Sequence, residues 1–565
     1  MRLSLSLLLL VLISIQLPGC AAEQAKVVPH AQTEFAAFLK DFETRLIPLS
    51  RNANLASYEA NISGREEDYK RSEELQLAEK KLYSDPGTFA RLKTWRSGGA
   101  VTDPILARQL DLLYLAFLGN QLPAEMLAEL VARETALERT FNTFRATLDG
   151  RTVSDNELDA VLTESKDSAR LERAWMASKA VGKTAAPAIV ELVTLRNKAA
   201  KAVGYPNFQA MQLALSEQDP AQVETLFDEL DALTRDDFAR VKEEVDGLLA
   251  RRLGIAKGAL RPWHYQDRFF QSAPRVYAVD LDGYYKGRDL VKLADQYYGG
   301  IGLPVTDILN RSDLFEKPGK YQHAMSTDID REGDVRILCS IKPNAYWMDT
   351  ILHELGHGAY SKFYDPALPF LLRDAAHAFT TEAIANLFGR LASDPAWLQQ
   401  MLGLGAQERA RIEQPLADSQ RLEQLVFSRW SQVMFRFEKA MYENPNQDLN
   451  ALWWNLVERY QLLRRPEGRN EPDWASKIHV ALYPAYYHNY LMGQLLASQF
   501  SRHVAVAVLK ADGPQRASFT GRKDVGAYFI ENVFKPGSRF PWNEMIERAT
   551  GEPLTAKYYA AEFVR

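Results

Sequence analysis

Apolar residues recur at three- and four-residue spacing along most of the chain, which is the pattern of amphipathic helices. The longest of these stretches span residues 30–50, 65–83, 103–120, 220–254 and 408–443. Helix-stopping residues follow three helical stretches, at Gly119, at Asp149-Gly150 and at Gly254. Residues 333–341 read GDVRILCSI, a β-rich run. The pattern therefore predicts a large, mainly α-helical domain with a small β-sheet near residues 333–341.

The composition is that of an ordinary soluble globular protein. Of the 565 residues, 46% are hydrophobic and 25% are charged, and the formal net charge is −5. The chain has ample apolar material for a core, and it lacks the basic balance typical of nucleic-acid-binding proteins. We therefore expect no nucleic-acid partner.

The N-terminus has the layout of an export signal. Arg2 is followed by an apolar run over residues 3–17, which is shorter than the ~20 residues of a membrane span. LPGC (17–20) is similar to a bacterial lipobox, in which Cys20 becomes the lipidated first residue of the mature chain. We expect residues 1–20 to be this signal and the protein to be an exported, periplasmic lipoprotein of the outer membrane. The alternative is cleavage nearby, after Ala21 or Ala22, which would give a soluble periplasmic protein.

Residues 353–357 read HELGH. His353 and His357 lie four residues apart, so on a helix both imidazoles face the same side and can reach one ion. Glu354 lies beside them, placed to take a proton from the attacking water. Histidine is scarce, nine in the whole chain, which weakens a chance pairing as the explanation. The motif predicts a zinc site with its catalytic base.

A third ligand is expected because hydrolytic zinc sites usually have three protein ligands and one open position. Glu382 lies in a second apolar helical stretch, AFTTEAIANLFGRL (378–391), where a carboxylate needs a partner. We expect Glu382 to bind the zinc; the alternative is a glutamate at a capped helix start. Asn386, one turn on, could orient a ligand histidine. We expect His377 to be a wall residue and not a ligand.

A second constellation follows in residues 475–500, which hold His479, Tyr483, Tyr486, Tyr487 and Tyr490 beside Lys477. Histidine and tyrosine are suitable donors to the oxyanion that forms during amide hydrolysis. A lysine can hold a carboxylate as a point charge. Taken alone, an aromatic stripe of this kind is more often part of a core.

Several ordered segments together resemble one family. They are residues 174–211, LNRSDLFEKPGKYQHAMSTDI (309–329), the HELGH helix with Glu382, WWNLVERYQ (453–461) and KIH (477–479). With these segments, the chain from about residue 30 to its end resembles the angiotensin-converting-enzyme family of zinc peptidyl-dipeptidases, and it is identified as a bacterial member. HExxH by itself is moderately specific, whereas this ordered set is highly specific.

The resemblance implies a fold and an activity. It implies a single metallopeptidase domain over residues 26–565, with two helical lobes around a long central cleft and a helical lid from about residues 30–120. The implied substrates are short peptides, from which the enzyme would release C-terminal dipeptides. The implied cofactor is one zinc ion. The membrane would be contacted only through the lipid anchor.

The resemblance also implies roles for single residues. His353, His357 and Glu382 would hold zinc, and Glu354 would be general base and then acid. His479 and Tyr490 would stabilise the tetrahedral intermediate. The C-terminal carboxylate would be held by Lys477 and Tyr487, with Gln266. His323 and the Ala324 backbone would bind the peptide main chain, and Asp328 would support that segment. Because AYYHNY (485–490) has one residue more than the family's PYIRY, Tyr486 competes with Tyr487 for the carboxylate role.

Departures from the family pattern lead to one further expectation. Asn489 and Val457 replace arginines that serve chloride binding in the animal enzymes, so we expect activity without chloride. Asn386 stands where the family has an aspartate.

Two alternatives to a peptidyl-dipeptidase remain at this point. One is an oligoendopeptidase of the thimet type, whose His-to-Tyr spacing fits less well and which lacks the HAxxxD segment. The other is an envelope lipoprotein that binds peptides without catalysis. The presence of Glu354 together with all three ligands argues against the second alternative.

Overall fold

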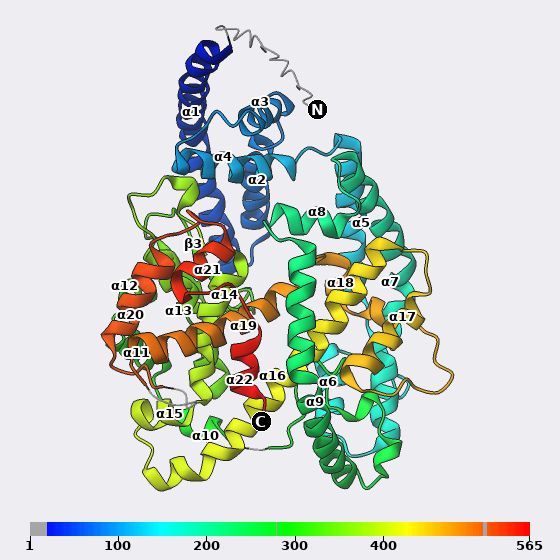
Figure 1. The fold of residues 1–565 in the computed structure, drawn as a ribbon. Helices are drawn as coiled ribbons and strands as arrows, with labels where there is room; N and C mark the ends of the chain where they lie inside the picture. The colour runs from blue at the N-terminus through cyan, green and yellow to red at the C-terminus, as the bar shows by residue number, and fades with distance from the viewer. Residues whose placement is uncertain (1–19, 278, 512–516) are drawn as a thin grey trace, which may run out of the picture.

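The computed structural model describes residues 20–277, 279–511 and 517–565, and these residues are mainly helical. Figure 1 shows two groups of helices side by side, with the N-terminal helices gathered at one end. The predicted mainly α fold is confirmed. The predicted signal, residues 1–19, and the Cys20 side chain lie outside what the structure describes. Among the described helices, none is both long enough and apolar enough to cross a membrane.

The first lobe surrounds the HELGH helix and has its own hydrophobic core. Its elements are α10 (Asp282–Tyr285), α11 (Leu290–Gly300), α12 (Thr306–Arg311), β3 (Met325–Asp328), β4 (Val335–Leu338), α13 (Ala345–Lys362), α14 (Ala378–Gly389), α15 (Pro395–Leu402), α20 (Lys523–Phe529), α21 (Trp542–Thr550) and α22 (Lys557–Phe563). Strands β3 and β4 pair antiparallel, with Met325 opposite Leu338 and Asp328 opposite Val335. They form the small sheet that the sequence predicts.

The second lobe has a separate core. Its elements are α5 (Ala124–Thr143), β1 (Ala146–Leu148), β2 (Arg151–Val153), α6 (Asp155–Glu164), α7 (Ser168–Ala202), α8 (Phe208–Leu215), α17 (Leu449–Leu456) and α18 (Ile478–Leu482). The sequence pattern treats Asp149-Gly150 as a simple helix stop. In the structure this pair forms the turn of the β1–β2 hairpin, and both residues have positive φ, as two-residue hairpin turns require.

Three helices join the two lobes. They are α9 (Pro220–Leu253), α16 (Ala406–Glu443) and α19 (Tyr487–His503), and each contributes side chains to both cores. In α16, for example, Leu416 packs in the first core and Leu425 in the second. Because the same rigid helices are buried in both lobes, they fix where residues of one lobe stand relative to the other.

The N-terminal helices pack on a third, smaller core. They are α1 (Cys20–Ser63), α2 (Glu66–Leu82), α3 (Pro86–Ser97) and α4 (Pro104–Leu118), and Figure 1 shows them in blue. Their aromatic centre includes Phe42, Trp95 and Phe117, and Phe370 of the first lobe packs into it. These helices match the range in which the sequence predicts a lid.

Candidate active site

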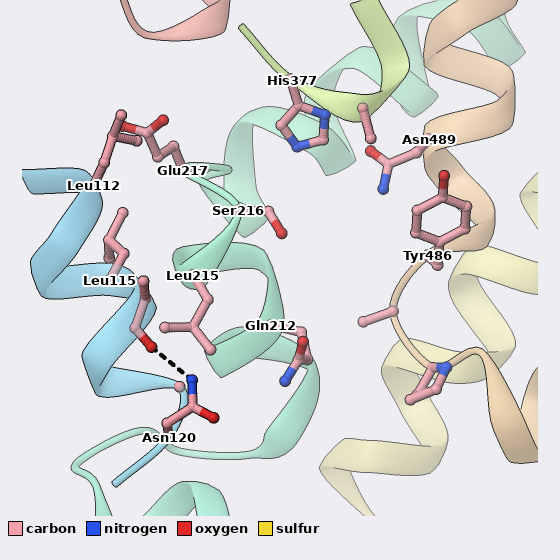
Figure 2. Close-up of a pocket in the computed structure, with 15 residues that line it drawn as sticks. Leu112, Leu115, Asn120, Gln212, Leu215, Ser216, Glu217, His377, Tyr486 and Asn489 are labelled. Atoms are coloured by element: carbon pink, nitrogen blue, oxygen red, sulfur yellow. Dashed lines mark hydrogen bonds between the residues drawn. The ribbon is translucent and has the colours of Figure 1, made fainter. Parts of the chain in front are cut away.

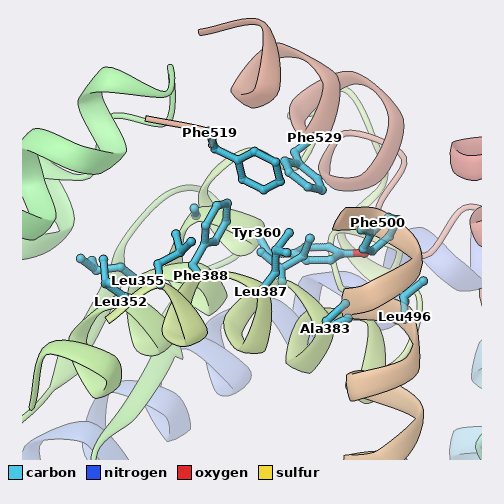
Figure 3. Close-up of a cluster of buried hydrophobic side chains, with 14 of the residues drawn as sticks. Leu352, Leu355, Tyr360, Ala383, Leu387, Phe388, Leu496, Phe500, Phe519 and Phe529 are labelled. Carbon is cyan, nitrogen blue, oxygen red and sulfur yellow. The ribbon is translucent and has the colours of Figure 1, made fainter. Parts of the chain in front are cut away.

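Helix α13 is anchored at its start and along one face. The Asn344 side chain caps it by accepting a hydrogen bond from the Trp347 backbone N–H at 2.9 Å. Leu352, Leu355 and Tyr360 point into the core of the first lobe, where they meet side chains of α14 and α19 (Figure 3). The opposite face of α13 carries both histidines, because four residues separate them.

Glycine lets α13 and α14 approach closely. A Cβ atom on Gly356 would lie 2.8 Å from the Ala385 Cα atom, and one on Gly389 would lie 3.3 Å from the His353 Cβ atom. Neither position has room for a larger side chain without a backbone shift. This close contact brings Glu382 of α14 to the histidines of α13.

The three predicted ligands meet at one point. The ligand atoms of His353, His357 and Glu382 all lie within 4.8 Å of one another. The two Nε2 atoms are 3.2 Å apart, and His353 Nε2 is 3.7 Å from Glu382 Oε2. Three Lewis-basic atoms in this arrangement fit a tetrahedral cation with one open position, and this donor set suits zinc.

Burial keeps the two imidazoles in the form that binds metal. It lowers the pKa of His353 to about 4, and it lowers the pKa of His357 further below its ordinary value, with a smaller contribution from His353. Both rings are therefore neutral at pH 7. Burial raises the pKa of Glu382 to about 7. A cation among these three groups would favour the ionised carboxylate.

Glu354 is buried beside this cluster, with only 8% of its surface exposed. Burial, and secondly the charge of Glu382, raise its pKa to about 8. A buried carboxylate with a raised pKa is suited to accept and return a proton near neutral pH. The geometry supports the predicted general base.

Thr381 is a site residue that the sequence argument does not find. Its Oγ1 lies 2.8 Å from His357 Nδ1, so the hydroxyl fixes the ring orientation that aims Nε2 at the cluster. No described contact gives Asn386 this orienting role; it instead lines a cavity beside His353. His377 is the N-cap of α14 and stands apart from the ligand cluster, as predicted. In the sequence, the only sign of this role is that Thr381 directly precedes the predicted ligand Glu382.

Helix α19 brings Tyr490, one of the two predicted oxyanion donors, close to the predicted zinc ligands, and His479 comes from the preceding helix α18. A Cβ atom on Gly493 would lie 3.1 Å from the Glu382 Cβ atom, so α19 touches α14 at the ligand itself. Tyr490 lies one turn before Gly493, and Glu382 contributes to raising its pKa after burial. The His479 ring centroid is 6.5 Å from that of Tyr490, so both predicted donors share one wall.

His479 has an unsatisfied polar atom. Its buried Nδ1 has no hydrogen-bond partner among the described residues, and a buried polar atom in this state costs about 1–3 kcal/mol. Burial, and secondly Lys477, lower the pKa of His479 to about 4. The ring is therefore a neutral donor at pH 7, ready for a substrate oxygen.

Lys477 is held in an aromatic cage. Its Nζ lies 5.5 Å from the ring centroids of Phe269, Trp430 and Tyr487 and donates to Gln271 Oε1 at 2.6 Å. Burial lowers the pKa of Lys477 to about 8; Asp267 opposes this shift and Arg268 adds to it. The ammonium group is therefore charged at pH 7 but poorly hydrated, which favours a carboxylate partner.

Tyr487, and not Tyr486, is the tyrosine beside Lys477. Its hydroxyl accepts a hydrogen bond from Trp430 Nε1 at 2.7 Å, which holds it in place. The Tyr486 ring instead lies 5.2 Å from that of Tyr490, and Glu382 contributes to raising its pKa to about 12 after burial. Tyr486 therefore lies on the side of the predicted zinc ligand Glu382.

The glutamine that contacts Lys477 is Gln271, where the sequence argument names Gln266. The side chain of Gln266 is occupied within its own loop: its Nε2 donates to the Thr163 carbonyl at 3.1 Å and its Oε1 accepts from the Arg275 backbone N–H at 2.7 Å. Gln266 also has a positive φ of 62°. The resemblance implies Gln266 for the carboxylate site, whereas the structure places Gln271, five residues further along the chain, in contact with Lys477.

A cavity of about 410 Å³ connects the two groups of residues. We call His353, His357, Glu382 and Glu354 the metal end, and Lys477, Gln271 and Tyr487 the lysine end. The cavity is lined by His353 at the metal end and by Gln271 and Tyr487 at the lysine end. The cavity therefore reaches from one predicted zinc ligand to two neighbours of Lys477.

The predicted His323-Ala324 segment directly precedes β3 (Met325–Asp328). Strand β3 packs against α13, and a Cβ atom on Gly358 would lie 3.7 Å from Ser326 Oγ. His323 is exposed, with its ring centroid 5.2 Å from that of Tyr321, and Ala324 packs partly buried against the first core. Asp328 accepts from the Arg331 backbone N–H at 2.8 Å and has no contact with the ligand cluster.

Figure 2 shows a second cavity, of about 580 Å³, behind Tyr486. Helices α4 and α8 line it together with His377 and Asn489. The Asn489 Oδ1 atom accepts a hydrogen bond from Gln218 at 2.8 Å, and Val457 is buried. Both positions that the sequence argument links to chloride are thus neutral side chains, and Asn489 is committed to a neighbour.

Comparison with known proteins agrees with this site. The family profile described as Angiotensin-converting enzyme, Peptidase M2, matches residues 29–259 and 277–560. An angiotensin-converting enzyme of Theromyzon tessulatum is 24% identical over 442 residues, covering 72% of this chain and 70% of the relative. One of Haematobia irritans exigua is 24% identical over 495 residues, covering 79% of each. An angiotensin-converting-enzyme-like protein of Mus musculus is 24% identical over 472 residues, covering 77% of this chain and 62% of its own length. The chain belongs to the angiotensin-converting enzyme family of metallopeptidases, peptidase family M2.

Proposed function

We propose that the protein is a zinc-dependent peptidyl-dipeptidase that releases C-terminal dipeptides from short peptides. The observation that carries the proposal is the cavity between the metal end and the lysine end. A buried ammonium group near one end of a substrate cavity selects a free carboxylate, and the predicted metal site at the other end marks where the peptide bond is cut. The proposal extends what family membership gives, because relatives at 24% identity do not fix the specificity.

The residues of the metal end divide the chemistry between them. His353, His357 and Glu382 would hold a zinc ion, which supplies Lewis-acid polarisation of the peptide carbonyl and of the attacking water. Glu354 takes a proton from that water and delivers it to the departing amine. Thr381 keeps the His357 ring in its ligating orientation.

The wall formed by α18 and α19 stabilises the charge that develops on the carbonyl oxygen. The Tyr490 hydroxyl and a neutral His479 N–H donate hydrogen bonds to this oxygen. His479 gains a partner for a ring that is otherwise left with an unsatisfied nitrogen. His323 and the Ala324 backbone, at the start of β3, bind the peptide main chain before the cleaved bond.

The lysine end sets the position of the cut. The substrate's terminal carboxylate accepts hydrogen bonds from Lys477 and from the Tyr487 hydroxyl, and Gln271 holds the Lys477 ammonium group in place. The distance from this group to the metal end then decides how many residues are removed, which we propose to be two.

The test uses pairs of short peptides that differ only in a free or an amidated C-terminus, with products identified by mass. We expect dipeptide release from the free peptides and strongly reduced cleavage of the amidated ones, and no cleavage after chelation. Equal rates for both members of a pair would contradict the proposal and favour an oligoendopeptidase. A protein that holds no zinc and cleaves no peptide would favour the non-catalytic, peptide-binding alternative.

Three accompanying expectations complete the proposal. Helices α1–α4 act as a lid that admits short peptides and excludes folded proteins. Activity does not need chloride, which replacement of chloride by acetate in the assay would check. The protein is exported and lipid-anchored at Cys20, which mass analysis of the mature N-terminus would check.

A further inference from the structure

The cavity between the metal end and the lysine end is rich in acidic groups. Its lining includes Asp349 of α13 and Glu423 of α16, and among the lining residues Arg390 is the one arginine. Apolar lining comes mainly from Phe427. A cavity for an uncharged side chain would not need carboxylates, because charged groups are costly to hold in a cleft without partners.

Asp349 is the less constrained of the two carboxylates. It lies one helical turn before His353, and its Oδ2 would lie 3.3 Å from a Cβ atom on Gly389, which also lines the cavity. Its side chain is exposed to the cavity. In the described part of the chain, its carboxylate has no hydrogen-bond or ion-pair partner at contact distance, and the charge that acts on it is that of Arg390.

Asp349 shares the one arginine of the lining with other groups, because the charge of Arg390 acts on Asp349 but also on Glu562. Glu423 Oε2 accepts a hydrogen bond from the Ala273 backbone N–H at 2.7 Å and has no cationic partner among the described residues. The Arg390 guanidinium is shared with Gln494 and with Glu562, whose Oε2 lies 3.6 Å away. One arginine therefore serves Glu562 as well as Asp349, and the lining holds more carboxylates than arginine or lysine side chains.

We propose that Asp349 makes the enzyme prefer a lysine or arginine as the C-terminal residue of its substrate. This inference rests on the proposed function, in which the last residue's carboxylate is held by Lys477 beside Gln271 and Tyr487. Since both of these residues line the cavity, the side chain of the same terminal residue enters it. A long cationic side chain pairs with Asp349, and Glu423 adds attraction at longer range.

The first test is equilibrium binding of two dipeptide products, Ala-Lys and Ala-Leu, to the zinc-loaded wild-type protein by calorimetry. We expect Ala-Lys to bind roughly tenfold more tightly. In Asp349→Asn, the affinity for Ala-Lys should fall roughly tenfold while that for Ala-Leu stays within about twofold. Asp236→Asn is the matched control, because it removes the same charge from an exposed site on α9.

The second test compares kcat/KM for peptides ending in Lys, Arg, Gln or Leu in the same variants. Asp349→Glu should retain part of the preference for Lys and Arg. Equal affinity for both dipeptides in the wild type, or a preference that survives Asp349→Asn, would overturn the inference. A binding preference that depends on Asp349, in a protein that cleaves none of the peptides, would overturn only the proposed function.

Discussion

The two ends of the cavity are built in different ways. The metal end is assembled from two adjacent helices, α13 and α14, whose ligands lie within 30 residues of one another in the sequence. The lysine end joins Gln271, Trp430 and Lys477, which lie in three separate segments. Local helical periodicity places the two histidines and Glu354 on α13, and the close contact of α13 with α14 adds Glu382. The residues of the lysine end are placed only by the packing of the second lobe.

The difference also appears in how each end holds its charges. At the metal end, three buried bases face one another and need a cation to be satisfied. At the lysine end, a buried cation is surrounded by aromatic faces and a neutral amide, and it needs an anion. Under the proposed function, we expect these opposite polarities to orient a peptide along the cavity. Breaking either end should therefore give a distinct kinetic signature.

The largest effect is expected from Glu354→Gln. The amide cannot accept the water's proton, so kcat should fall about 10³-fold, while dipeptide binding at the lysine end is unchanged. Steady-state kinetics, calorimetry with a dipeptide and metal analysis of the same preparation would measure the three quantities. A variant that keeps more than a tenth of wild-type kcat would show that Glu354 is not the base.

Lys477→Met should act at the other end. The substitution keeps the length and apolar contacts of the side chain but removes its charge, so kcat/KM for free-carboxylate peptides should fall roughly 100-fold. Cleavage of amidated peptides should change little, because they never use the ammonium group. An equal loss on both kinds of peptide, with normal circular dichroism, would contradict a carboxylate-binding role.

Gly356→Ala tests the close contact that builds the metal end. The new methyl group would lie 2.8 Å from the Ala385 Cα atom, so the free energy of unfolding should fall by about 1–3 kcal/mol. Urea denaturation would measure it. Gly299→Ala is the control, because its methyl group meets nothing within 4 Å and an alanine in α11 should be neutral or slightly stabilising.

The pH dependence should separate the two ends. Burial lowers the pKa of Lys477 to about 8. Its side chain is therefore mostly charged below pH 8 and loses this charge as the pH rises above 8. KM for free-carboxylate peptides should therefore rise about tenfold from pH 7 to pH 9. In Lys477→Met this increase should disappear. A wild-type KM that stays constant to pH 9 would contradict the lowered pKa.

The smallest effect is expected from Gln271→Leu, which removes the hydrogen bond that positions Lys477. KM for free-carboxylate peptides should rise roughly fivefold, consistent with the loss of about 1 kcal/mol. Gln266→Leu should leave KM unchanged and only lower stability, because Gln266 bonds within its loop. If Gln266→Leu raised KM and Gln271→Leu left it unchanged, the sequence-based choice of Gln266 would be supported.

Much of the helical framework follows from the sequence alone. The expected helix over 220–254 corresponds to α9 (Pro220–Leu253), and Gly254 ends it in the left-handed conformation. The expected stretch 408–443 corresponds to α16 (Ala406–Glu443). Periodicity and end signals are local properties, so they survive without tertiary context. The Asp149-Gly150 turn was misread because a helix stop and a hairpin turn use the same residues.

The amino-acid sequence by itself determined the metal end. His353, His357 and Glu354 are related by helical spacing, and Glu382 was chosen because an acid in an apolar helix needs a partner. The tertiary structure alone decided that Gln271 contacts Lys477, that Tyr487 and not Tyr486 lies beside it, and that Asp349 opens into the cavity. The reason is physical: residues on one helix are placed by its repeat, whereas contacts between distant segments depend on how the cores pack.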